Sequence, residues 1–207
     1  LENQHKLFFL AEGFSEVGRL LLERYRIIER LGEGGMGTVF EVEDTVMDEC
    51  VALKILHLEQ VDTAIEERVK REFRMMNQLS HPNILEVKEL HGLPDGRLAI
   101  CMPLMEGTLK DALQAVDEEQ VLLWARQLLS ALDYMHNREP PVLHRDIKPS
   151  NVLLDKEGRA KLGDFGIARQ EGDIRLTRTA EQQPGSTPYM APELSEGSQA
   201  SAASDRY

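Results

Sequence analysis

Cysteine, basic residues and long hydrophobic runs are all scarce in this sequence, and each scarcity excludes a class of protein. Two cysteines, Cys50 and Cys101, cannot build a disulfide framework and are typical of reduced thiols in a cytoplasmic protein. Lys and Arg number 24 against 36 Asp and Glu, and the net charge of −12 argues against nucleic acid or an anionic membrane surface as a partner. The apolar run at residues 7–11 is far shorter than the ~18–20 residues of a membrane span, and no later run approaches that length.

The rest of the composition is that of a globular protein, with 42% hydrophobic and 29% charged residues. A chain of 207 residues has room for one domain or a small two-lobed one, and it can bury a sizeable core. Residues 1–24 carry apolar side chains at roughly helical spacing, which predicts an amphipathic N-terminal extension.

The hydrophobic pattern then changes twice along the chain. After residue 24, short alternating segments and turn residues predict strands with one helix among them, at residues 63–80. After residue 107 the period becomes helical and predicts a helix at residues 118–137. A strand-rich first half and a helix-rich second half indicate an α+β protein whose two lobes meet near residues 103–107. The strands expected are residues 25–31, 38–44, 51–57, 85–91, 97–102, 151–154 and 160–162.

A glycine-rich string occupies residues 32–39, with the sequence G-E-G-G-M-G-T-V. Glycines let backbone N–H groups approach phosphate oxygens without a Cβ in the way. A dinucleotide-binding fingerprint would continue into a helix, whereas the segment after Gly37 is strand-like. The string therefore predicts either a phosphate-binding hairpin or a glycine-rich turn without a ligand.

A lysine, Lys54, lies inside an apolar strand, where a charge is costly unless it is paired or faces a cleft. The predicted helix offers an acid, because Glu72 follows Val69 by three residues and precedes Met76 by four, on the apolar face. We expect an ion pair that orients Lys54. The alternative for Glu72 is a solvated surface charge, since charged residues surround it in the sequence.

Two loops beside predicted strands are dense in reactive side chains. Residues 144–151 read H-R-D-I-K-P-S-N, and residues 164–166 read D-F-G. The amide oxygen of Asn151 and the carboxylate of Asp164 can converge on one hard cation, which suits Mg²⁺ beside phosphate.

With Ala-Pro-Glu at residues 191–193, these motifs occur in the order of one family, and the chain resembles a eukaryotic-type (Hanks-type) protein kinase from residue 25 onward. The wording of the motifs is similar to that of bacterial serine/threonine kinases, and Lys148 in the catalytic loop resembles the Ser/Thr class. The resemblance implies a bilobal kinase fold: an antiparallel five-stranded N-lobe with one helix at residues 25–102, a hinge at 103–107 and a mainly helical C-lobe at 108–207. We expect this C-lobe to be incomplete, because Asp205 resembles the aspartate that begins the family's central C-lobe helix.

The resemblance also implies roles for single residues. Asp146 accepts the proton of the substrate hydroxyl, and Lys148 neutralises charge near the transferred phosphoryl group. Lys54, oriented by Glu72, holds the α- and β-phosphates. Asn151 and Asp164 ligate Mg²⁺. The ATP-binding residues that it implies are Leu31, Gly32, Glu33, Gly34, Gly35, Met36, Gly37, Val39, Ala52, Lys54, Met102, Met105 and Leu153.

The function implied is transfer of the γ-phosphate of ATP, with Mg²⁺, to Ser or Thr hydroxyls of protein substrates. Phosphorylation of Thr177 or Thr179 would add about two negative charges that can pair with Arg145, which predicts autophosphorylation and, with it, self-association. Two alternatives remain open: a nucleotide-binding interaction module without phosphoryl transfer, and an inert fragment of a longer gene product. If the C-lobe is incomplete, we expect the 207-residue chain by itself to be aggregation-prone or partly folded, with weak activity or none.

Overall fold

The structure, a computed structural model, describes residues 17–34, 37–57, 63–114, 116–164, 189–195 and 199–207. They form two compact units. Unit 1 comprises the described residues of Leu1–Arg71 and Val87–Leu104, and unit 2 those of Glu72–Glu86 and Met105–Tyr207. The segment 72–86 thus belongs to unit 2, although the predicted first lobe contains it. The domain boundaries derived from the sequence stay predictions.

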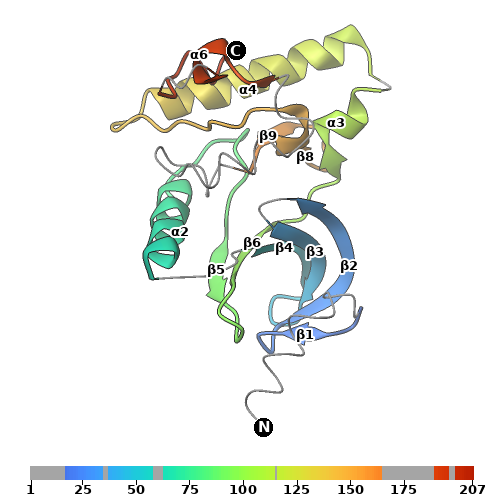
Figure 1. Cartoon of the computed structure of the whole chain (residues 1–207). Helices are drawn as coiled ribbons and strands as arrows, with labels where there is room; N and C mark the ends of the chain where they lie inside the picture. The colour runs from blue at the N-terminus through green and yellow to red at the C-terminus, as the bar shows by residue number, and fades with distance from the viewer. Residues whose placement is uncertain (1–16, 35–36, 58–62, 115, 165–188, 196–198) are drawn as a thin grey trace. The chain divides into compact units, whose positions relative to one another are not determined.

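Unit 1 is built on a curved antiparallel sheet of six strands in the order β1-β2-β3-β4-β6-β5 (Figure 1). Strands β2 and β3 form the hairpin that carries the glycine-rich string, and Gly34 pairs with Gly37 at its end. Strand β6 lies between β4 and β5, pairing antiparallel with both. The bounds are β1 Leu20–Leu21, β2 Tyr25–Gly34, β3 Gly37–Asp44, β4 Glu49–Leu56, β5 Glu89–Gly92 and β6 Leu98–Pro103.

One face of this sheet holds the hydrophobic core of unit 1. The register pairs Phe40 with Leu53 and Leu53 with Cys101, so these side chains share a face, and all three are buried in one cluster with Tyr25. Burying a Phe or Leu side chain contributes roughly 1.5–3 kcal/mol. The alternate residues of β3, β4 and β6 therefore lie on the opposite face.

The five strands predicted for residues 25–102 are β2 to β6, and a sixth strand, β1, precedes them. Leu20 and Leu21 form β1 and pair with Arg26 and Tyr25, within the segment predicted to be an amphipathic extension with roughly helical apolar spacing. The chain reverses through Leu22 and Glu23, both at positive φ (53° and 56°). Leu21 is buried against the core of unit 1. The apolar spacing of residues 17–22 thus serves a tight hairpin rather than a helix.

Unit 2 contains a three-stranded sheet in the order β7-β8-β9 and the long helix α4. Asp117 caps α4, because its side chain accepts a hydrogen bond from the Gln120 N–H. Trp124 of α4 is buried and donates its indole N–H to the carbonyl of Gly158 at 2.8 Å, which fixes the helix beside the β8–β9 turn. The bounds are β7 Gly107–Thr108, α3 Leu109–Ala112, α4 Glu118–His136, η1 Pro149–Asn151, β8 Val152–Leu154, β9 Ala160–Leu162 and α6 Pro192–Ser195.

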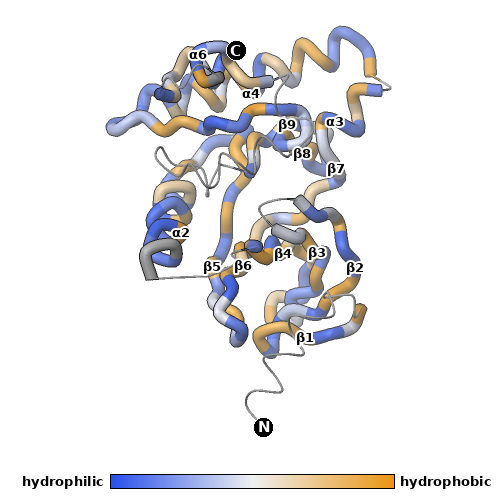
Figure 2. The backbone as a smooth tube through the Cα atoms, in the orientation of Figure 1, coloured by the Kyte–Doolittle hydropathy of each residue, from blue (hydrophilic) through white to orange (hydrophobic). Residues whose placement is uncertain are grey.

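Helix α2, Thr63–Met76, is the helix predicted at residues 63–80, four residues shorter. It is largely hydrophilic along its length (Figure 2). Val69 and Met76 are nevertheless buried, and so is Glu72, with 9% of its surface exposed. Glu72 is therefore not the solvated surface charge that the sequence left as an alternative.

Among the described residues, no helix combines the length and the apolar character that crossing a bilayer requires.

Candidate active site

The glycine-rich hairpin of unit 1 contains glycines of two kinds. A Cβ on Gly37 would lie 2.4 Å from the carbonyl oxygen of Ile55, so the packing of β3 on β4 requires glycine there. A Cβ on Gly32 or Gly34 would meet no described atom within 4 Å. The packing of the described residues therefore does not require glycine at these two positions, which leaves room for the predicted close approach of a ligand.

Four predicted nucleotide-binding residues share the sheet face opposite the core. The register pairs Val39 with Lys54 and Ala52 with Met102, and Ala52 precedes Lys54 by two residues on β4. Paired residues and residues two apart project from the same face. Lys54, Ala52 and Met102 are buried. The face thus combines one buried ammonium group with apolar side chains, as the recognition of a purine nucleotide would require.

The catalytic loop of unit 2 is fixed around Asp146. Lys148 Nζ lies 3.1 Å from Asp146 Oδ2. Asn151 donates its amide protons to Asp146 twice, to the backbone oxygen at 2.7 Å and to Oδ2 at 2.9 Å. Asp146 is buried and Lys148 is only 16% exposed in its side chain. The carboxylate is therefore held in one orientation beside a cation, a geometry that suits the predicted role of Asp146 as a proton acceptor.

The donors present fit a divalent cation with oxygen ligands. Because the NH₂ group of Asn151 is committed to Asp146, its Oδ1 is the atom that faces away from that carboxylate and can take a cation. The Gly163 N–H donates to the Asn151 carbonyl at 2.9 Å. Because Asp164 directly follows Gly163, this bond holds the backbone of Asp164 close to Asn151. Asp164 has φ of 53°, a left-handed conformation that a non-glycine residue rarely adopts. The described residues contain no cluster of three or more His, Cys, Asp or Glu that would hold a metal ion by itself.

A buried network supports this loop, and sequence reasoning did not foresee most of it. Asp205 accepts the backbone N–H of His144 and of Arg145, each at 2.8 Å, and lies 3.0 Å from His136 Nε2. His144 accepts the Asp146 N–H on Nδ1, so its Nε2 donates to the Gly163 carbonyl at 2.8 Å. Complete burial lowers the pKa of His144, which keeps the imidazole neutral at pH 7.

Arg145 lies between His144 and Asp146 in the chain and has φ of 68°. The bonds from the His144 and Arg145 N–H groups to Asp205 stabilise this backbone conformation. The sequence singled out Asp205 as the start of a helix, but the bond to His136 had no signal in the spacing.

The other predicted residues fall into four groups. Leu31 is half exposed, and Glu33 is paired on the surface with Arg30 at 2.7 Å. In unit 2, Met105 precedes β7, and Leu153 of β8 pairs with Thr108. Lys54 and Glu72 lie in different units, so their ion pair stays a prediction. The residues outside the described part of the chain are Gly35, Met36, Thr177 and Thr179.

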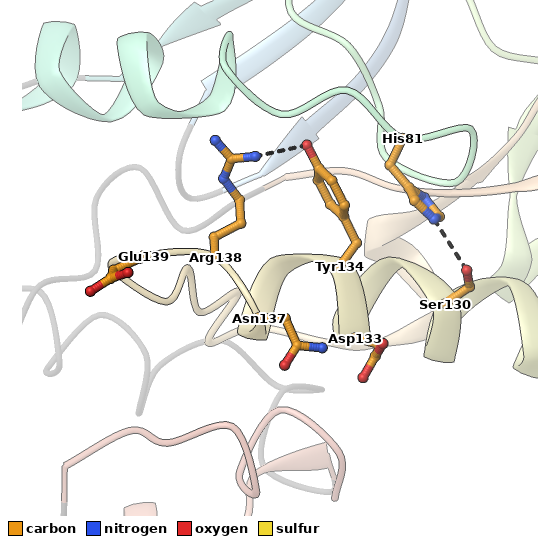
Figure 3. Close-up of a pocket in the computed structure, with 7 residues that line it drawn as sticks. All are labelled: His81, Ser130, Asp133, Tyr134, Asn137, Arg138 and Glu139. Atoms are coloured by element: carbon orange, nitrogen blue, oxygen red, sulfur yellow. Dashed lines mark hydrogen bonds between the residues drawn. The ribbon is translucent and has the colours of Figure 1, made fainter.

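A polar pocket of about 630 Å³ lies elsewhere in unit 2, at the C-terminal half of α4 (Figure 3). His81 Nδ1 accepts the Asn83 N–H, so its Nε2 faces Ser130 Oγ at 3.1 Å. The hydroxyl of Tyr134 accepts from the Ser80 N–H and from Arg138. These bonds attach the loop after α2 to α4, and the pocket contains none of the predicted catalytic residues. Its lining residues are His81, Ser130, Asp133, Tyr134, Asn137, Arg138 and Glu139.

A second, mostly apolar cavity of about 450 Å³ adjoins the catalytic loop. Leu128, Leu129 and Leu132 of α4 line one side, and Asp146 and Lys148 lie at its edge. The catalytic loop therefore borders an apolar surface of unit 2.

Comparison with known proteins agrees with this arrangement. Residues 25–207 match the protein kinase domain family. The chain is 37% identical over 199 residues to the probable serine/threonine-protein kinase PknB of Lactococcus lactis, covering 93% of this chain and 31% of that protein. It is 36% identical over 196 residues to the serine/threonine-protein kinase PrkC of Bacillus subtilis, covering 92% and 30%. The chain thus spans about a third of the length of these curated relatives.

Among solved structures, the Mycobacterium tuberculosis PknI kinase domain is similar, with a TM-score of 0.67, 31% identity and coverage of 93% of this chain and 71% of that chain.

Proposed function

Because the chain belongs to the protein kinase family, we propose that it is a protein serine/threonine kinase that transfers the γ-phosphoryl group of ATP to Ser or Thr hydroxyls of protein substrates. The observation that carries the proposal is the fixed cluster of Asp146, Lys148 and Asn151 in the catalytic loop. The sequence also keeps Lys54, Glu72 and Asp164, so none of the predicted catalytic or cation-binding positions is substituted as it would be in a decayed member of the family.

In the proposed reaction, Asp146 orients the attacking hydroxyl and takes its proton on a carboxylate oxygen. The nearby Lys148 ammonium stabilises negative charge that develops on the transferred group, since it lies only 3.1 Å from Oδ2. A positioned general base contributes about 10²–10⁴-fold to a rate. The phosphorus–oxygen bond to the leaving ADP breaks as the bond to the hydroxyl oxygen forms, so positioning and charge account for most of the catalysis.

The cofactors of the proposed reaction are ATP and Mg²⁺. Asn151 Oδ1 and the Asp164 carboxylate would hold the cation, which when bound neutralises phosphate charge. Lys54, paired with Glu72, would hold the α- and β-phosphates. Gly32 and Gly34 would let the hairpin backbone approach the phosphates.

The proposal extends to regulation and location. Phosphorylation of Thr177 or Thr179 by a second copy of the chain would place negative charge where Arg145 can pair with it. Self-association is then required for that step. Reduced cysteines and the acidic net charge support a cytoplasmic kinase without nucleic acid as a partner.

The test is transfer of labelled γ-phosphate to a generic protein substrate, together with Mg–ATP binding measured by calorimetry. We expect Asp146→Asn to retain ATP binding and to lose at least about 10²-fold in transfer, because only the proton acceptor is removed. Asp164→Asn should lose Mg²⁺-dependent transfer, because a proposed ligand of the cation is removed. Asp155→Asn is the matched control, a carboxylate of the same unit that pairs with Arg159, and it should behave like the unaltered chain.

ATP binding without any transfer by the unaltered chain would favour the interaction-module alternative. Equal transfer by the unaltered chain and by Asp146→Asn would overturn the proposed mechanism.

A further inference from the structure

The hydrogen bond between Thr38 and His57 in unit 1 has no role in the reaction as described. Thr38 Oγ1 lies 2.8 Å from His57 Nε2, across the ends of β3 and β4. Thr38 directly follows the last glycine of the hairpin, and His57 directly follows the last residue of β4. The pair therefore adds one side-chain bond to the β3–β4 ladder, at the end of β3 that begins with Gly37.

The pair lies on the core face of the sheet, opposite the face of Lys54. Thr38 pairs with Ile55 in the register, and Ile55 belongs to the buried core cluster. His57 follows Ile55 by two residues, so its side chain leaves the backbone on the same side. Thr38 is 9% exposed. The bond thus holds the hairpin on the core face of the sheet. The predicted nucleotide-binding residues lie on the opposite face.

The backbone of Gly37 packs tightly against β4. Gly37 packs so closely on the Ile55 carbonyl that a Cβ would lie 2.4 Å from it. Any shift of Thr38 relative to β4 therefore moves Gly37 with it, and Gly37 pairs with Gly34 of β2. The side-chain bond at Thr38 thus helps to position the paired glycines Gly34 and Gly37.

We infer that His57 is a positioning residue for ATP, acting through Thr38 on the glycine-rich hairpin. This inference rests on the proposed function, in which that hairpin covers the phosphates. His57 itself does not touch the nucleotide. Its loss should weaken the binding of Mg–ATP and leave the proton transfer at Asp146 unchanged.

The experiment compares Thr38→Val, His57→Ala and the double variant in the full chain. Amide hydrogen exchange over residues 37–40 is measured without nucleotide, and KM for ATP and kcat are measured in the transfer assay. Each single variant should speed exchange at these amides and raise KM about threefold to tenfold, the range that follows from losing one hydrogen bond, with kcat retained. The double variant should match the single ones, since both remove the same bond.

Thr38→Ser keeps the hydroxyl and should restore both readouts. Glu43→Gln, which removes another side-chain contact of β3 to β2 through Arg26, is the matched control and should change neither. Unchanged exchange in His57→Ala, or an equal rise of KM in Glu43→Gln, would overturn the inference. Failure of the unaltered chain to bind Mg–ATP would overturn the proposed function and with it the nucleotide part of the inference, whereas the exchange rates would still decide whether His57 holds the hairpin.

Discussion

At the scale of residues, two glycines of the hairpin are expected to serve different purposes. Gly37 is required by the packing of the sheet, and Gly34 is proposed to allow ligand binding. Gly34→Ala should weaken Mg–ATP binding with little change in the free energy of unfolding, because the new Cβ meets no described atom within 4 Å. Gly37→Ala should destabilise unit 1 by about 1–3 kcal/mol, because its Cβ overlaps the Ile55 carbonyl. Calorimetric ATP titration and urea unfolding measure the two effects. Equal destabilisation by both variants would show that the hairpin packs more tightly than these contacts imply.

Asp44 is a second residue whose role is open to a direct test. Two bonds from Arg24, at 2.8 and 2.6 Å, lower the pKa of Asp44 to about 2. A lowered folded-state pKa gives stability that is fully present above the unfolded value, near 4, and is lost as the pH falls toward 2. The shift corresponds to about 2 kcal/mol. We expect Asp44→Asn to lose that stability at pH 7 and to differ little from the unaltered chain at pH 2.

Urea unfolding at pH 7, 4 and 2 measures this difference, and Asp48→Asn, an exposed carboxylate at the same turn, is its control. A difference between Asp44→Asn and the unaltered chain that stays constant from pH 7 to pH 2 would contradict the role of the Arg24 pair.

The site residues could be predicted from the sequence because each stands in a motif whose order and spacing carry meaning. The hydrogen bonds that hold these residues in place could not be predicted from the sequence. The bond between His136 and Asp205 joins residues 69 positions apart, and nothing in either neighbourhood marks the pair. The same holds for Thr38 and His57, since a threonine and a histidine at strand ends are ordinary in a sequence. Such contacts depend on strand register, which a single sequence leaves undetermined.

At the scale of elements, long patterns were predictive and short ones were not. The helix at residues 118–137 corresponds to α4, because five turns of periodic sequence outweigh local noise. Strand β1 at Leu20–Leu21 was not predicted, because a two-residue strand and a tight turn present the same apolar spacing as a helix. The strand predicted at residues 85–91 is reduced to β5, Glu89–Gly92. Its first residues bond elsewhere: the Leu85 N–H donates to the Leu162 carbonyl in unit 2.

The apolar surface of α4 has a testable consequence. Along α4, Val121 is 38% exposed, whereas Leu132 is 4% exposed. Leu132→Ala should therefore cost about 2–5 kcal/mol of unfolding free energy. Leu122→Gln and Leu129→Gln replace side chains that are 51% and 55% exposed, so they should cost little and reduce aggregation of the 207-residue chain.

Urea unfolding and light scattering at rising protein concentration measure these two effects. Aggregation that is unchanged by the two glutamine variants together would mean that another surface is responsible.

At the scale of the whole molecule, the residues predicted to bind ATP and its Mg²⁺ divide between the two units. Lys54, Ala52 and Met102 belong to unit 1, and Asn151 and Asp164 belong to unit 2. The sequence could order these residues along the chain, since each motif is local. It could not assign segment 72–86 to a unit, because that depends on which neighbours Met76, Leu79 and the following loop pack against. A ligand that needs residues from both sets links the stabilities of the two units.

That linkage can be measured because the chain carries one natural probe in each unit. Trp124 is the only tryptophan of the sequence and is buried in unit 2, so its fluorescence reports unfolding of that unit. Cys101 is buried in unit 1, and burial raises the pKa of its thiol, so it reacts with iodoacetamide only when unit 1 opens. Cys50 is exposed and is removed as Cys50→Ser. We expect Mg–ATP at 100 times its dissociation constant to stabilise the protein by about 2.7 kcal/mol, and both probes to report it.

Asp164→Asn removes a proposed cation ligand from unit 2 alone. In that variant we expect Mg–ATP to lose its protection of Cys101 in unit 1 as well as of Trp124, because the proposed function requires residues of both units for one ligand. Asp155→Asn, a carboxylate of unit 2 that pairs with Arg159, should keep both effects. Protection of Cys101 that survives unchanged in Asp164→Asn would show that nucleotide binds unit 1 without the cation ligands of unit 2, and would contradict a site that draws on both sets of residues.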